Sequence, residues 1–119
     1  MSVKLMKKMD RVLIWEGEAT ETYVINYPTV DLSKFQYIMV KGNQTELMLL
    51  PIVGAGKYNG SMVAFAASNM YVKALQISIT NDHAYIEYAK EKIIGGSTIT
   101  SGFSTFKIFK IFGIYWHHK

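Results

Sequence analysis

Histidines are the side chains of this sequence best suited to bind a metal. His83 stands alone, and His117 and His118 are adjacent, so their rings would point to opposite faces of a strand. Zinc requires three or four ligands that converge on one point, and this spacing does not supply them. We therefore predict no metal site and no cofactor.

Acidic residues around Gly17 are the next group that could do chemistry. If a strand continues through this glycine, Glu16 and Glu18 share one face, as the paired carboxylates of a hydrolase do. No matching acid–base partner follows nearby, and acids at an exposed turn are common. We expect solvated acids here, not a hydrolytic pair.

Nucleophiles and phosphate loops are equally hard to identify. The chain has no cysteine, which excludes disulfides, thiolate metal sites and cysteine nucleophiles. Ser61 follows Gly60, but the surrounding sequence is not a nucleophile elbow. The glycine-rich stretch 54–60 has neither dinucleotide nor P-loop spacing, and no helix is expected after it. We name no catalytic residue and predict that the protein is not an enzyme.

A few aromatic and amide residues suit binding better than catalysis. Tyr58 and Asn59 are expected at a loop tip, where such side chains are typical of recognition surfaces. Trp116 lies near the carboxyl end and should be more exposed than Trp15, which stands in an apolar run. We predict that Tyr58, Asn59 and Trp116 bind a ligand, and tryptophan favours a sugar.

Charge and hydropathy limit the partners further. The net charge is +4, but the lysines are scattered and Arg11 is the only arginine, so we predict no nucleic-acid binding. No segment approaches the roughly 18 consecutive apolar residues of a membrane-spanning helix. No signal peptide is evident at the amino terminus. We expect synthesis in a cytoplasm and no membrane insertion.

Short runs of β-branched and aromatic residues, separated by turn residues, must position these side chains. At 119 residues the chain has room for one core. We predict an all-β, antiparallel, jelly-roll-like sandwich of roughly eight strands, with residues 1–10 as an N-terminal segment and residues 11–116 as a single domain. Strands are expected at 11–16, 20–27, 35–41, 46–53, 61–67, 71–80, 83–90 and 103–114.

The clearest pattern is a hairpin around Asn81 and Asp82, residue types that tolerate positive φ. Before the turn, Leu75, Ile77 and Ile79 share one face, with Lys73 as a polar exception. After it, Ala84, Ile86 and Tyr88 alternate with His83, Tyr85 and Glu87. One face of this hairpin should therefore point into a core.

The last strand is apolar on both faces. Alternation puts Phe106, Ile108 and Phe112 on one side and Phe109 and Ile111 on the other. Either a neighbouring subunit covers the outer side, or the strand is central and the N-terminal segment overlies it. We predict that Phe106, Ile108, Phe109, Ile111 and Phe112 form an oligomer interface.

Both ends of the sequence resemble structural proteins of tailed phages. Residues 12–19 (VLIWEGEA) and 32–40 (LSKFQYIMV) are similar to an opening that runs Leu-Trp-x-Gly-x-Ala, a strand, Leu-Ser-x-Phe/Tyr and a further strand. Residues 106–114 (FKIFKIFGI) are similar to the Ile-x-Lys-Ile-Tyr-Gly-Ile close of the same proteins, with Phe112 in place of the tyrosine. The resemblance implies a β-sandwich module of tail tips, baseplates or fibres, often trimeric, and no catalytic residues.

These observations lead to a functional expectation. We expect a phage virion or tail-associated structural protein that forms a homo-oligomer, with a trimer favoured and other virion proteins as partners. A host-surface glycan would be an additional ligand. The chain begins with its own methionine, which favours a stand-alone virion component over a fibre tip. The alternative is a monomeric carbohydrate-binding module, and a small hydrolase comes third.

Overall fold

Strands make up almost all of the regular structure. The computed structural model describes residues 8–42, 46–66, 68–95 and 102–117. Within these ranges the chain forms nine strands and one short 3-10 turn, η2. The elements are β1 (Lys8–Ala19), β2 (Val24–Asn26), η2 (Leu32–Lys34), β3 (Tyr37–Gly42), β4 (Leu47–Pro51), β5 (Gly56–Ala66), β6 (Asn69–Ile79), β7 (His83–Gly95), β8 (Ser104–Thr105) and β9 (Ile108–His117).

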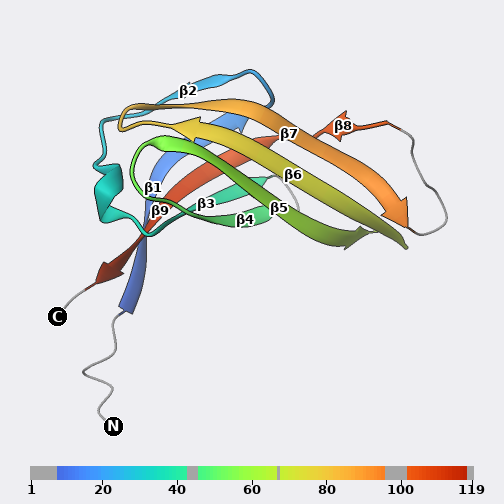
Figure 1. Cartoon of the computed structure of the whole chain (residues 1–119), viewed down its shortest axis with the longest axis horizontal. Coiled ribbons are helices and arrows are strands. Elements are labelled where there is room, and N and C mark those ends of the chain that lie inside the picture. Colours follow the sequence, from blue (N-terminus) through green and yellow to red (C-terminus); the bar gives the residue numbers. More distant parts are fainter. Residues whose placement is uncertain (1–7, 43–45, 67, 96–101, 118–119) are drawn as a thin grey trace, which may run out of the picture.

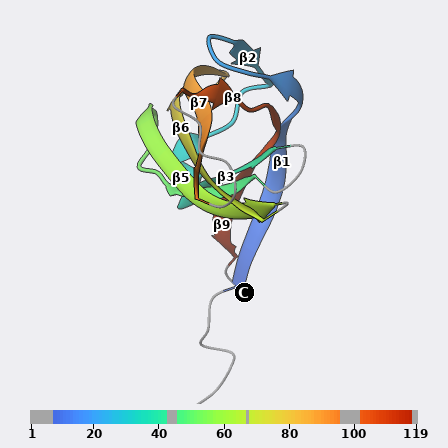
Figure 2. The same ribbon diagram turned by 90° about the vertical axis from the view of Figure 1, so that its right-hand side faces the viewer.

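The strands form two antiparallel sheets that pack as a sandwich. Sheet A has the order β1-β9-β3-β4, and sheet B has the order β2-β7-β6-β5 with β8 added beside β7. In Figure 1, β5, β6 and β7 cross in front of sheet A, and the end-on view of Figure 2 places β5 and β1 on opposite sides. The predicted antiparallel sandwich is confirmed. The jelly-roll arrangement is not confirmed, because β5, β6 and β7 follow one another as a simple meander.

The core fills the space between the sheets with aliphatic side chains. Leu50, Ile77, Ile86 and Ile108 are each fully buried. The inward positions of β6 are Leu75, Ile77 and Ile79, as the sequence alternation predicted. Burying one such side chain contributes about 1.5–3 kcal/mol relative to leaving it in water. A cysteine-free chain therefore has a core large enough to replace covalent cross-links.

A β-bulge in β9 changes which residues of the last strand face the core. In the pairing with β3, Lys41 lies opposite Lys110 and Gly42 opposite Ile108, so Phe109 is the additional residue. An extra residue reverses the alternation beyond it. Ile108 and Ile111 consequently both point inward and are at most 2% exposed, whereas Phe112 is half-buried on the outside. The predicted division of this strand into two faces is wrong for that reason.

A second bulge, in β7, also changes which side chains face the core. Ile77 of β6 lies opposite Ile86, but its neighbour Gln76 lies opposite Tyr88, so Glu87 is the additional residue. Ala84 and Ile86 face the core as predicted, and Ala89 takes the next inward position. Tyr88 is 54% exposed and faces outward, which contradicts its predicted place on the core face.

Two glycines lie within strands against the ring of a large side chain, and one of them, Gly17, we had assigned to a turn. Gly17 is inside β1, and the indole of Trp15 covers it: a Cβ atom added there would lie 2.5 Å from Cζ2 of that ring. Gly113 is inside β9, where an added Cβ would lie 2.5 Å from Cε1 of Phe35. Glycine at these positions lets a large ring approach the strand closely. This close contact explains both glycines, and at Gly17 it replaces the turn that we predicted.

Candidate functional site

The three residues that we predicted to bind a ligand do not come together. Tyr58 and Asn59 lie in β5 and not on a loop, because the strand already begins at Gly56. The Tyr58 hydroxyl accepts a hydrogen bond from the Val53 backbone N–H (2.8 Å) and donates one to the Gly54 carbonyl (2.9 Å), and its ring packs against the core. Asn59 faces outward on sheet B, whereas Trp116 lies in β9 of sheet A. A single site made of these three residues is therefore ruled out.

The predicted interface residues are also divided between two places. Phe106, Ile108 and Ile111 are at most 5% exposed and belong to the core of this chain, so they have little surface to offer a partner. Phe109 and Phe112 remain partly accessible. The strand is central, between β1 and β3, as our second explanation of its apolar character required. Strand β1 lies beside it in the sheet, and residues 1–7 of the N-terminal segment that we expected to overlie it are outside the described residues.

The outer face of sheet A nevertheless carries a continuous apolar row. Leu13 lies opposite Phe112, Phe112 opposite Met39, and Met39 opposite Leu49, so the row crosses all four strands. Leu13 is 45% exposed and Leu49 is 55% exposed. We call this row, together with the flanking rows described next, the sheet A face. Sequence alternation missed it because the bulge in β9 decides where Phe112 points.

Two mixed rows flank the apolar row. On one side, Arg11 lies opposite Ile114, which lies opposite Tyr37, and the guanidinium of Arg11 lies 4.8 Å from the ring centroid of Phe112. The other side carries Glu16, Lys110, Lys41 and Leu47 in the same way. Glu16 and Lys110 are 3.9 Å apart and both are well exposed, so this ion pair contributes little to stability. The sheet A face therefore has an apolar centre between one row with a single arginine and another with one carboxylate and two lysines.

The outer face of sheet B is different in character. Asn59, Gln76 and Tyr88 lie opposite one another across β5, β6 and β7. They border a depression of about 500 Å³ whose lining combines amides, small residues and aromatic rings. Of the predicted ligand-binding residues, this site contains only Asn59. The sequence did not point to Gln76 or Tyr88.

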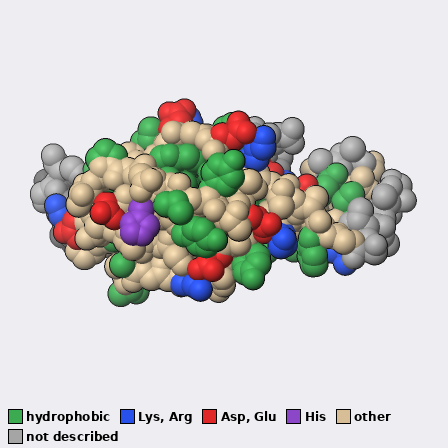
Figure 3. Space-filling view, turned by 90° about the horizontal axis from the view of Figure 1, so that it is seen from above, with side chains coloured by type: hydrophobic (Ala, Val, Ile, Leu, Met, Phe, Trp, Pro, Cys, Tyr) green, Lys and Arg blue, Asp and Glu red, His purple; other side chains and the backbone are tan. Residues whose placement is uncertain are grey.

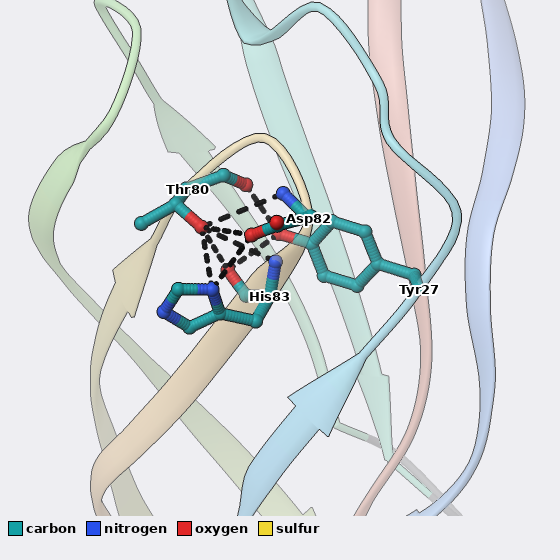
Figure 4. Close-up of polar contacts among 4 residues, drawn as sticks. All are labelled: Tyr27, Thr80, Asp82 and His83. Atoms are coloured by element: carbon teal, nitrogen blue, oxygen red, sulfur yellow. Dashed lines mark hydrogen bonds and ion pairs between the residues drawn. The ribbon is translucent and has the colours of Figure 1, made fainter.

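A Thr–His–Asp cluster occupies the turn between β6 and β7 (Figure 4). Nδ1 of His83 lies 2.9 Å from Thr80 Oγ1 and 2.8 Å from Asp82 Oδ1. The hydrogen bond with His83, followed by one that Asp82 accepts from Thr80 Oγ1 (3.1 Å), lowers the pKa of the Asp82 carboxyl. A catalytic triad needs the acid on one ring nitrogen and the nucleophile on the other. Here both contact the same nitrogen, so this cluster braces the turn and has no base positioned to activate Thr80.

This turn forms without the positive φ angles that we predicted for Asn81 and Asp82. The only non-glycine residues with positive φ in the described part of the chain are Thr22 and Ser68. Instead, the segment after β2 holds the turn from outside. Backbone N–H groups of Tyr27 and Val30 donate to the carbonyls of Asp82 (3.1 Å) and Asn81 (2.7 Å), respectively. The hairpin itself is confirmed.

A buried ionic cluster links the two sheets near the opposite end of β6. Lys73 lies on the core face, where the ion pair with Glu91 measures 3.0 Å and a second carboxylate, that of Glu46, also contacts its ammonium group. Burial lowers the pKa of Lys73, but hydrogen bonds and charges from both carboxylates outweigh it and raise the pKa overall. Both carboxylates contact the same ammonium group, which indicates a structural clamp and not a reactive lysine.

Charges on the rest of the surface are mixed in sign. Viewed from above relative to Figure 1, hydrophobic side chains lie among acidic and basic ones (Figure 3). Among the residues that the structure describes, no three His, Asp or Glu side chains converge as metal ligands would. The same residues form no helix of sufficient length and hydropathy to span a bilayer.

Comparisons with known proteins add no relative to this description. The chain matches no protein-family model, no curated protein and no solved structure. The two outer faces of the sandwich are accordingly the basis for assigning a function.

Proposed function

We propose that this protein is a non-enzymatic structural module that forms a homo-oligomer through the sheet A face. The observation that supports this proposal is the apolar row of Leu13, Phe112, Met39 and Leu49. Contiguous exposed apolar surface of this kind marks interaction sites on folded proteins. The resemblance of residues 12–19, 32–40 and 106–114 to tailed-phage structural proteins supports a virion as the place of assembly.

Charges on the flanking rows favour a second copy of the same chain as the occupant. Consider two sheet A faces packed against each other about a two-fold axis that lies between them, parallel to the rows and perpendicular to the strands. The apolar row of one chain then packs on the apolar row of the other. The row that contains Glu16 and Lys41 packs on the row that contains Arg11 and Tyr37. Glu16 faces Arg11 of the second copy, and Lys41 faces a Tyr37 ring, a cation–π arrangement.

The other two-fold packing is less favourable. An axis parallel to the strands would place Lys110 over Lys41 of the second copy, and like charges across an interface cost several kcal/mol. The charge pattern therefore selects one orientation. The trimer implied by the sequence resemblance is a competing prediction, which the mass of the assembly distinguishes.

The test is a pair of matched substitutions. Leu49 on the sheet A face and Val63 on sheet B are both 55% exposed in a single chain, so a charge at either position should leave the fold intact. We expect Leu49→Asp to convert a dimer to monomer in light scattering at micromolar concentration, while Val63→Asp stays dimeric. A wild-type protein that is monomeric, or equal behaviour of the two variants, contradicts the proposal.

A further inference from the structure

The depression on sheet B has the form of a ligand site independent of the sheet A face. Its floor lies in the middle of three paired strands and is low because the outward-facing pair Ser61 and Ala74 have small side chains. Tyr88 and Phe103 border it and are 54% and 68% exposed. The site is therefore a shallow, open groove floor with two aromatic rings beside it.

Amide groups provide the polar contacts of this floor. Gln76 Nε2 donates a hydrogen bond to Asn59 Oδ1 at 2.9 Å. Among the described residues this is the only side-chain hydrogen bond of either amide, so the Asn59 NH₂ group and the Gln76 carbonyl oxygen can still bond to a ligand. The pair thus offers donors and an acceptor together, which matches vicinal sugar hydroxyls that both donate and accept.

Charge argues against a phosphate backbone as the ligand. Lys90 borders the depression, but its ammonium group lies 3.0 Å from Glu21 and is partly neutralised. Lys92 lies 5.3 Å from the ring centroid of Phe103. Nucleic-acid binding depends on several cations that replace counterions along the backbone. Two lysines, one of them already paired, do not provide such a surface.

The position in the sheet argues against an extended peptide. Peptides commonly bind a sandwich by adding a strand to a free sheet edge. The floor is centred on β6, whose backbone groups already pair with β5 on one side and β7 on the other. Strand β5 ends the sheet order among the described strands, but a strand added there would lie beside this floor and not on it. Recognition on the floor must therefore use side chains that point outward from the sheet.

We propose that this depression binds an oligosaccharide. The ring of Tyr88 stacks on the apolar C–H face of one pyranose, and Asn59 and Gln76 hydrogen-bond its hydroxyl groups. Flat apolar rings with a few convergent polar groups are the usual composition of small-ligand sites. No carboxylate lines this depression in the described part of the chain, so the expected outcome is binding without hydrolysis.

The experiment uses the full chain, labelled with ¹⁵N, and a panel of hexasaccharides of glucose, mannose, N-acetylglucosamine and galacturonate. We expect at least one member to shift amide signals of Asn59, Gln76 and Tyr88. The affinity for that sugar should fall about tenfold in Tyr88→Ala and in Gln76→Ala. Tyr23→Ala is the matched control, because Tyr23 is also about half exposed (51%) and lies outside the depression.

Three outcomes would overturn this proposal. The first is that no member of the panel binds at about 1 mM, the weak end of specific association. The second is that the shifted amide signals all belong to sheet A. The third is that Tyr23→Ala loses as much affinity for the sugar as Tyr88→Ala does. The Leu49→Asp variant separates this result from the proposed assembly. A monomeric Leu49→Asp protein should still bind the sugar, and a monomeric wild type would not count against the sugar site.

Discussion

At the scale of single residues, Tyr27 shows how one side chain can hold a turn. Its hydroxyl lies 2.6 Å from the Thr80 carbonyl oxygen and 2.8 Å from that of His83, at the two ends of the β6–β7 turn, and shares its single proton between them. Burial, and after it the negative charge of Asp82, raise the pKa of Tyr27 to about 12. The protonated hydroxyl is therefore the form that the fold requires.

This shift predicts an alkaline loss of stability. The unfolded chain ionises this tyrosine near pH 10, whereas the folded chain does so only near pH 12. The contribution of Tyr27 is therefore complete below pH 10 and is lost as the pH rises through 12. Tyr27→Phe should remove this dependence and lower the free energy of unfolding at pH 7 by about 1 kcal/mol.

The measurement is urea unfolding at a series of pH values, together with the ultraviolet absorbance of tyrosinate. Tyr23→Phe is the control, because that side chain is exposed. In the wild type, the absorbance step at the highest pH should belong to Tyr27. If Tyr27→Phe still shows that step, the raised pKa does not belong to Tyr27.

At the scale of the elements, the buried cluster of Lys73, Glu46 and Glu91 joins the sheets. Glu46 directly precedes β4 of sheet A, whereas Lys73 and Glu91 face each other in β6 and β7 of sheet B. The rings of Tyr71 and Phe106 lie 5.7 Å and 5.8 Å from the lysine ammonium. A charge that is removed from water in this way destabilises the fold unless partners of opposite charge compensate for the lost hydration.

Removing the lysine should therefore destabilise the fold strongly. We expect Lys73→Ala to lower the free energy of unfolding by about 3–5 kcal/mol, because two carboxylates would remain without their cation. Lys57→Ala is the matched control: its ion pair with Glu87 is exposed and should contribute less than about 1 kcal/mol. Chemical denaturation of both variants provides the comparison, and equal losses would argue against the clamp.

The two bulges also act at this scale. Each adds one residue to a strand and so transfers a later side chain to the opposite face. In β9 the bulge brings Phe112 into the apolar row of sheet A, and in β7 it brings Tyr88 to the rim of the depression. Both proposed binding surfaces thus depend on a bulge within a strand.

At the scale of the whole molecule, the orientation of the proposed dimer can be tested by exchanging charges. The packing that we propose places Arg11 of one copy opposite Glu16 of the other. Arg11→Glu and Glu16→Arg should each weaken dimerisation by about tenfold, and the double variant should recover most of the loss. Analytical ultracentrifugation at several protein concentrations gives the dissociation constants.

Ionic strength provides a further check on the same contact. Added salt screens charges that remain accessible to solvent, so it should reduce the difference between the single variants and the wild type. Failure of the double variant to recover affinity would exclude the proposed orientation, even if the sheet A face proved to be the interface.

The sequence alone was sufficient to predict the fold class and most of the strands. Runs of β-branched and aromatic residues between turn residues predicted an antiparallel sandwich, and strict alternation in residues 75–79 identified core positions that the structure confirms. These features are local, because strand propensity and side-chain alternation depend on neighbours in the chain. The hairpin at Asn81 and Asp82 is local for the same reason.

Only the tertiary structure decided which residues share a surface. A bulge forms where a strand pairs with its neighbours, and beyond it the inward and outward positions are exchanged. The alternation of residues in one strand does not reveal this exchange. For this reason Phe112 and Tyr88 were assigned to the wrong faces, and Gly17 was assigned to a turn although Trp15 covers it within β1. Asn59 and Trp116 looked equivalent as exposed binding residues, yet pairing places them on separate sheets. Binding surfaces on a sandwich are set by contacts between distant strands, and those contacts exist only in the folded chain.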